Sequence, residues 1–284
     1  MPKSQSFENV ILSIYKPIST LTLLYGLISV SFASIPIILL LNKYAYDNNG
    51  NLVCDNYVLN SYLYTILGFC YIALGMLLEQ KFQIMFMVIQ KGLVALIIFA
   101  IFILVTMYYM FKFIETTNPN EFIKINTYYA LACMIFGFVL TTSIMMGFKI
   151  NVLYQAISIT IGLTFLMAFI GYKYGHNFIT VDFDKYLRYS LFGLIIWSFV
   201  ASMFIRDLST RILAVSIPGL IIFCLLLMSY NNKLRKNAEK CKVPNYPKEA
   251  IGLVIKIGNL LSDIINILMV LRGRKKGNSL NFRT

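Results

Sequence analysis

The chain has 284 residues, of which 58% are hydrophobic and only 13% are charged. A soluble domain would be about 45–50% apolar and about 25% charged, so this composition excludes a soluble globular protein and indicates an integral membrane protein. The formal net charge of +13 would suggest nucleic acid as a partner of a soluble protein. In a membrane protein we attribute it to topology and to anionic lipid headgroups instead.

Long apolar runs recur along the chain, and each has about the 17–25 residues that a spanning helix needs. They cover residues 21–41, 61–78, 92–111, 127–148, 153–172, 187–205, 212–230 and 251–271. These runs predict an all-α fold, a polytopic membrane helical bundle with seven to eight transmembrane helices. Because the connections are short, we expect residues 21–271 to form a single transmembrane helical bundle.

Two terminal segments flank this bundle. From Phe7 to Ile18, apolar side chains recur at helical spacing, which predicts a short amphipathic helix over residues 5–16 that Pro17 ends. Residues 1–20 are therefore predicted to be an N-terminal interfacial amphipathic segment, with a helix packed on neighbouring loops as the alternative. Residues 272–284 contain five basic side chains and are predicted to be a basic C-terminal tail.

The last apolar run contains four polar residues on one helical face. Lys256, Asn259, Asp263 and Asn266 are spaced by 3, 4 and 3 positions, which is the repeat of an α-helix. A charge near the centre of a spanning helix costs about 2.5–3.5 kcal/mol on insertion scales. We therefore expect this polar stripe to face the protein interior, at a partner helix or a wet cavity.

The candidate partners of the stripe close the preceding apolar run. Ser229, Tyr230 and Asn231 are polar and are joined to the last run by a short basic loop. An unpaired charge in a dry bundle would cost several kcal/mol, so Asp263 is expected to lie within hydrogen-bond reach of a polar group. Removing Asp263 alone should then destabilise more than replacing Asp263 and Lys256 together by apolar residues.

Charge does not fix the orientation of the chain. Basic side chains cluster on both sides of the last run, in residues 231–250 and in residues 272–284, so a full span violates the positive-inside tendency at one end. A re-entrant segment would put both clusters on one side. We expect a full span, with the loops at 231–250 and 173–186 on the cytoplasmic or matrix-like side.

The sequence lacks the signatures of common cofactor and metal sites. Its five cysteines are odd in number and well separated, which predicts neither a disulfide framework nor a metal site; they are Cys54, Cys70, Cys133, Cys224 and Cys241. The single histidine, His176, excludes a bis-histidine haem within the chain. We expect no cofactor and no metal.

Enzyme motifs are also missing from the sequence. There is no H-E-x-x-H, P-loop, G-x-G-x-x-G or G-x-S-x-G motif. Intramembrane aspartyl catalysis would need two spanning aspartates, and only Asp263 lies inside an apolar run. We therefore expect no catalytic residues and no enzymatic activity.

Several segments resemble the transmembrane Bax inhibitor motif family. Ile222-Phe223-Cys224 followed by Ser229 to Leu234 is similar to that family's sixth helix, and Leu261 to Leu268 (LSDIINIL) is similar to its last helix, where L-D-I-I-N-L-F recurs. Weaker likeness is found in Val152 to Ala156 with Thr160, in Asp182-Phe183 and in Glu8 to Leu24. The resemblance covers mainly the C-terminal half.

The resemblance implies a seven-helix bundle of intracellular membranes that takes part in calcium leak and restrains cell death. Family members have two buried aspartates that form a pH-sensitive pair. Carried over, the last-helix aspartate is Asp263 and the sixth-helix aspartate falls at Asn231, which cannot ionise. The acid of the third helix is also replaced, with Gly137 or Phe138 near its place.

Two functions follow as expectations. The first is a Bax-inhibitor-type calcium-leak protein and cell-death modulator of an endoplasmic reticulum or Golgi membrane. The alternative is a non-catalytic accessory subunit of a larger membrane complex, for instance in the mitochondrial inner membrane. The expected partners are the lipid bilayer, anionic lipid headgroups and, for the alternative, other membrane subunits; no nucleic acid is expected.

Overall fold

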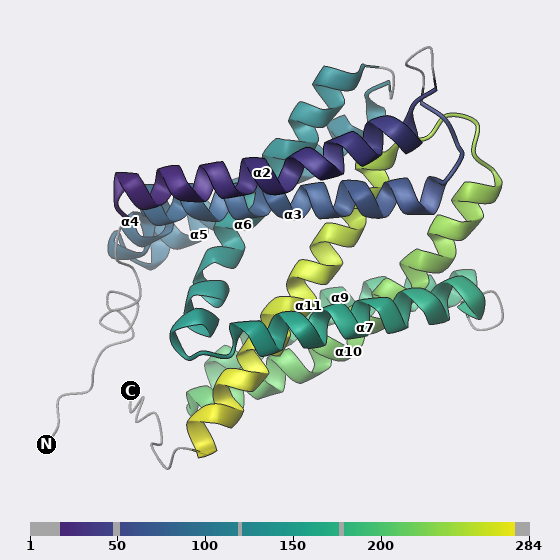
Figure 1. Cartoon of the computed structure of the whole chain (residues 1–284). Coiled ribbons are helices and arrows are strands. Elements are labelled where there is room, and N and C mark those ends of the chain that lie inside the picture. The colour runs from purple at the N-terminus through teal and green to yellow at the C-terminus, as the bar shows by residue number, and fades with distance from the viewer. Residues whose placement is uncertain (1–17, 48–51, 119–120, 176–178, 276–284) are drawn as a thin grey trace, which may run out of the picture. The chain divides into compact units, whose positions relative to one another are not determined.

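A computed structural model describes residues 18–47, 52–118, 121–175 and 179–275 (Figure 1). These residues form nine helices: α2 (Thr20–Ala45), α3 (Tyr57–Phe82), α4 (Ile84–Gln90), α5 (Leu93–Thr116), α6 (Phe122–Lys149), α7 (Leu153–Lys173), α9 (Val181–Phe204), α10 (Leu208–Glu239) and α11 (Tyr246–Lys275). The predicted N-terminal segment before residue 18, His176 and the predicted tail beyond residue 275 lie outside the described residues.

The all-α membrane fold is confirmed. Eight of the helices are long and apolar enough to cross a membrane, and each predicted apolar run falls on one of them. The short helix α4 follows α3 after Gln83, whose φ of 54° is left-handed. The Glu79 side chain, which is fully buried, accepts a hydrogen bond from the Met85 backbone N–H at 2.8 Å and so caps α4.

The prediction of a loop over residues 231–250 is wrong, because α10 continues to Glu239 and α11 begins at Tyr246. Lysine, arginine and leucine after residue 230 are good helix formers, so polarity at the membrane surface does not end the helix. Pro247 is the second residue of α11, and its missing N–H is tolerated in a first turn. The Asn245 side chain accepts the Lys248 backbone N–H at 3.0 Å and caps that turn.

Two compact units are present. The first comprises Thr142–Arg235 and the described residues from Lys256 onward, and the second comprises the described part of Tyr15–Thr141 with Lys236–Ile255. Helices α6, α10 and α11 each contribute to both units. The single bundle over residues 21–271 therefore stays a prediction, and the two units are described in turn.

In the second unit, glycines allow helices α3 and α6 to approach closely. A Cβ added to Gly75 would lie under 3.0 Å from the carbonyl oxygen of Met134, and one added to Gly137 would lie equally close to that of Ile72. Small residues at helix crossings allow this backbone contact in membranes. Gly137, one of the two residues near the place where the family resemblance implies an acid, is thus explained by packing. Helices α2 and α3 of the same unit lie side by side (Figure 1).

In the first unit, Gly171 has the same role between α7 and α10. A Cβ at Gly171 would lie under 3.0 Å from the Met228 carbonyl oxygen. The Arg235 guanidinium donates to the Tyr172 carbonyl at 2.9 Å, and the Arg272 guanidinium donates to the Asn151 carbonyl at 2.5 Å. Each arginine lies near the end of its own helix and binds a backbone carbonyl near the C-terminal end of another helix, where carbonyls lack helical partners.

Candidate functional site

The polar stripe of α11 lies at the edge of the buried face of that helix. Lys256, Asn259, Asp263 and Asn266 are all half-buried, whereas Leu260, Ile264 and Ile265 between them are buried. The Lys256 ammonium lies over the Tyr230 ring, 4.1 Å from its centroid. Of the three candidate partners, Tyr230 thus contacts the stripe through its aromatic face, in a cation–π interaction.

The Asp263 carboxylate meets α10 at Ser216 and Gly219. Ser216 is buried and its hydroxyl hydrogen-bonds to the carboxylate. The second carboxylate oxygen, Oδ2, is shut off from the surface and accepts no hydrogen bond within the described structure. A Cβ added to residue 219 would lie under 3.0 Å from Oδ2, so glycine at this position leaves the space that the carboxylate occupies.

A proline beside Gly219 interrupts the hydrogen bonds of α10. Pro218 lies inside the helix and has no N–H to donate, so the carbonyl of Ala214 loses its helical partner. The Trp197 indole of α9 donates to that Ala214 carbonyl at 2.9 Å. A single tryptophan from a neighbouring helix therefore repairs the break, directly beside the contact of α10 with Asp263.

Asn231 is not the residue that faces Asp263. Gly219 and Asn231 are twelve positions apart on α10, which corresponds to about 18 Å along the helix axis. Asn231 is buried and its side chain donates to the Leu227 carbonyl, one turn back, at 2.8 Å. The residue pairing carried over from the resemblance is therefore wrong in this structure, because the sequence likeness does not determine how the two helices are aligned.

Sequence reasoning did not identify Ser216 and Gly219. Both lie inside the apolar run 212–230, where small residues are ordinary packing elements of a bundle. Pro218 was the available signal, since a proline in a spanning helix frees a carbonyl and often marks a departure from regular packing.

The other predicted partner, Ser229, is buried on α10. Beside the stripe, the Ser262 hydroxyl donates to that of Ser143 on α6 at 3.0 Å.

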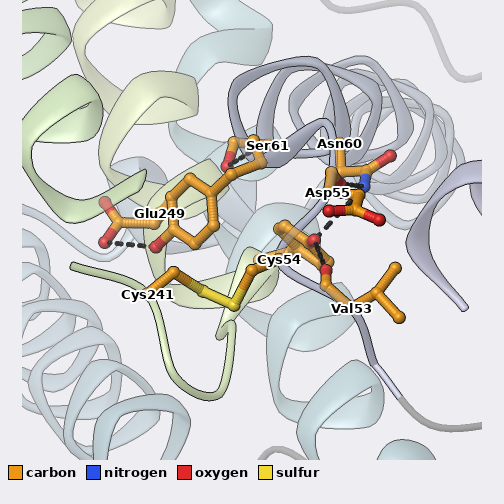
Figure 2. Close-up of a disulfide and its surroundings, with 9 residues drawn as sticks. Val53, Cys54, Asp55, Asn60, Ser61, Cys241 and Glu249 are labelled. Carbon is orange, nitrogen blue, oxygen red and sulfur yellow. Dashed lines mark hydrogen bonds between the residues drawn. A yellow bond between two sulfur atoms is a disulfide. The ribbon is translucent and has the colours of Figure 1, made fainter. Parts of the chain in front are cut away.

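A disulfide joins Cys54 and Cys241, whose Cα atoms are 5.9 Å apart (Figure 2). Cys54 precedes α3 and Cys241 follows α10. The expectation of no disulfide is therefore wrong. The two bonded cysteines are the ones that lie outside the apolar runs. They are 187 positions apart, so no local pattern in the sequence indicates that they pair. Cys70, Cys133 and Cys224 lie inside helices and are free.

The disulfide lies beside a buried glutamate that the sequence analysis did not consider. Glu249, in the first turn of α11, is only 6% exposed. Its carboxylate accepts hydrogen bonds from the Tyr57 hydroxyl at 3.3 Å and from the Asn237 amide at 2.8 Å. A carboxylate near a helix N-terminus is also favoured by the helix dipole. Glu249 is thus a structural anchor between α3, α10 and α11.

Tyrosines and an asparagine complete this polar cluster. The Asn60 amide donates to the Tyr246 hydroxyl at 3.2 Å, and that hydroxyl donates to the Val53 carbonyl. Outside the spanning helices, burial raises the pKa of the Tyr46 hydroxyl, so it stays protonated at neutral pH. Asp263 and Glu249 are fourteen positions apart on α11, about 21 Å along its axis, and do not form a carboxylate pair.

The two acidic positions differ in what they can do. Glu249 accepts two hydrogen bonds, both through Oε1, whereas the Oδ2 atom of Asp263 is buried without a donor. A carboxylate charge without donors is costly in the low dielectric of a membrane interior, so such an oxygen favours a proton or a cation as its partner. In the described part of the chain, no group of three metal-ligating side chains converges.

Comparison with known proteins gives one match. The family model described as Bax1-I, inhibitor of apoptosis-promoting Bax1, matches residues 54–273. No curated protein and no solved structure matches the chain. The family match begins well before the C-terminal half to which the resemblance was assigned. It contains seven of the eight candidate spanning helices, so the additional helix is α2, which precedes it. The chain is a multi-pass membrane protein that belongs to the Bax inhibitor family.

Proposed function

We propose that this protein is a calcium leak of an intracellular membrane that restrains cell death, with Asp263 as the charged residue of its path. One observation supports this proposal most: a carboxylate inside a spanning helix has one oxygen without a hydrogen-bond donor. Intramembrane carboxylates are costly and typically belong to ion pathways. The adjoining Ser216 adds a second oxygen beside the carboxylate, and Gly219 leaves the space that the carboxylate occupies.

The disulfide supports a specific membrane and orientation. Disulfides persist in oxidising compartments such as the lumen of the endoplasmic reticulum, and they are rare where thiols are kept reduced. We therefore infer a membrane of the secretory pathway, with Cys54, Cys241 and the 240–245 connection on its lumenal side. This orientation is opposite to the one expected from the basic cluster at residues 231–250.

Calcium stores in intact cells provide the test. Cells that express this protein should lose store calcium at least twofold faster, after their calcium pump is blocked, than cells with an empty vector. Asp263→Asn should return the rate to that of the vector, because the amide keeps the volume and removes the charge. Asp207→Asn is the matched control, since Asp207 is exposed and caps α10 through Thr210, and asparagine caps equally well.

Two outcomes would overturn the proposal. The first is that cells expressing Asp263→Asn lose store calcium as fast as cells expressing the wild type. The second is stoichiometric co-purification of other membrane chains in mild detergent together with unchanged store calcium. That result would support the alternative, a non-catalytic accessory subunit of a larger complex.

A further inference from the structure

A wholly apolar cavity lies on the second unit. It has a volume of about 420 Å³ and is lined by side chains of α4, α5, α6 and α11, among them Met85, Phe99, Ile103, Met107, Phe136 and Ile255. This volume lies within the range of about 300–1,000 Å³ that small-molecule sites occupy. The lining contains no polar side chain, so its occupant must be a hydrocarbon.

The cavity runs along α5 toward the C-terminal end of that helix. Its lining on α5 extends from Phe99 to Phe111, twelve positions or about 18 Å of helix. One leaflet of a bilayer has a hydrocarbon depth of about 15 Å. An extended acyl chain therefore matches the cavity in length, whereas a compact ligand would fill only part of it.

A second cavity continues the first and has charged residues at its rim. Its volume is about 190 Å³, and it shares Phe111 and Ile255 with the first cavity while adding Glu115 and Lys248. Glu115 is next to the last residue of α5, and Lys248 is in the first turn of α11. The two cavities together form a groove that is apolar along α5 and charged where α5 ends and α11 begins.

The charged end of the groove is held in place by the Asn245 side chain, which binds the backbone of both helices. The Asn245 amide donates to the Ile114 carbonyl at 3.1 Å, and its oxygen accepts the Lys248 N–H, so one side chain joins the end of α5 to the start of α11. The Lys248 ammonium and the Glu115 carboxylate are 2.7 Å apart, with side chains 42% and 62% exposed. An ion pair this exposed contributes little to stability, so its two charges can exchange partners at little cost.

We propose that this groove binds one zwitterionic phospholipid, with an acyl chain in the apolar cavity and the headgroup at Lys248 and Glu115. The lipid phosphate would pair with the Lys248 ammonium, and the positive amine of the headgroup would pair with the Glu115 carboxylate. A lipid with a purely anionic headgroup would satisfy Lys248 but would be repelled by Glu115. A sterol or fatty acid would leave at least one of the two charges unmatched.

Native mass spectrometry of the purified full chain tests this site. The protein is mixed with equal amounts of phosphatidylcholine and phosphatidylglycerol of the same acyl chains, and the lipids retained after gentle activation are identified. We expect one phosphatidylcholine per chain. Ala100→Trp, which fills the cavity, should lower its retention at least tenfold, whereas Ile101→Trp, at an exposed neighbouring position outside the lining, should leave it within twofold.

Charge variants test the headgroup end. Lys248→Glu should reduce phosphatidylcholine retention at least tenfold, and adding Glu115→Lys, which restores both signs in exchanged places, should recover most of it. Circular dichroism and size-exclusion profiles establish that each variant is folded. The proposal is overturned if Ala100→Trp retains as much phosphatidylcholine as the wild type, or if the retained lipid is mainly phosphatidylglycerol. Neither result depends on calcium leak.

Discussion

Replacing Gly75 by alanine is expected to lower the free energy of unfolding by about 1–3 kcal/mol, which is the usual cost of overpacking a tight core. The added methyl group would lie under 3.0 Å from the Met134 carbonyl oxygen. Because that atom belongs to the backbone of α6, it cannot rotate away as a side chain would. Helices α3 and α6 would have to separate, and the reciprocal contact of Gly137 with Ile72 would be lost with them.

The measurement is thermal or denaturant unfolding in detergent, followed by helical circular dichroism. Gly162→Ala in α7 is the matched control, since a Cβ there meets nothing within 4 Å and alanine favours a helix over glycine. This variant should be as stable as the wild type or slightly more stable. Equal stability of the Gly75 and Gly162 variants would contradict the close crossing of α3 and α6.

Removing the disulfide is expected to cost about 2–4 kcal/mol of unfolding free energy. Cys54→Ser breaks the link between two residues that are 187 positions apart and loosens the hold on the Glu249 cluster beside it. Membrane insertion already restricts the unfolded chain. We therefore expect the stabilisation typical of disulfides, and not the larger stabilisation that the length of the closed loop alone would give. Cys70→Ser, which removes a free half-buried cysteine of α3, is the control and should cost less than half as much.

The same cysteines report the compartment. In intact microsomes, a membrane-impermeant maleimide reagent should label Cys54 and Cys241 only after the membrane is permeabilised and the protein reduced. Labelling of Cys241 from the cytosolic side without a reductant would show that the bond is absent there. That result would restore the orientation expected from the basic cluster of residues 231–250.

Composition and periodicity were sufficient to predict the eight spanning helices, because burial in lipid requires long apolar segments that are visible in any sequence. The end of α10 could not be placed in the same way. Helix propensity, and not polarity, decides where a helix stops once it has left the membrane, so the expected loop at 231–250 shortened to residues 240–245.

The polar stripe of α11 was also predictable, since its spacing is a property of one helix. Its partners were not, because they depend on how two helices are aligned. Lys256 does contact Tyr230, but Asp263 lies at Ser216 and Gly219, about 18 Å of helix away from Asn231. The Cys54–Cys241 bond and the Glu249 cluster join segments nearly two hundred residues apart, and the sequence has no local pattern that pairs them.

The lysine contact also changes one expectation. Lys256 is stabilised by the Tyr230 ring, so removing Asp263 does not leave this lysine without a partner. The double replacement of Asp263 and Lys256 therefore loses its predicted advantage over the single Asp263 change.

Calcium efflux from proteoliposomes that contain only the purified protein tests the role of Asp263 most directly. We predict efflux at least tenfold above empty vesicles for the wild type and for Asp207→Asn, and efflux close to that of empty vesicles for Asp263→Asn. Gly219→Ala should also slow the leak, because its methyl group would lie under 3.0 Å from the Asp263 Oδ2 atom and force the carboxylate to move. Equal efflux from the wild type and Asp263→Asn would contradict the assignment of Asp263 to the calcium path.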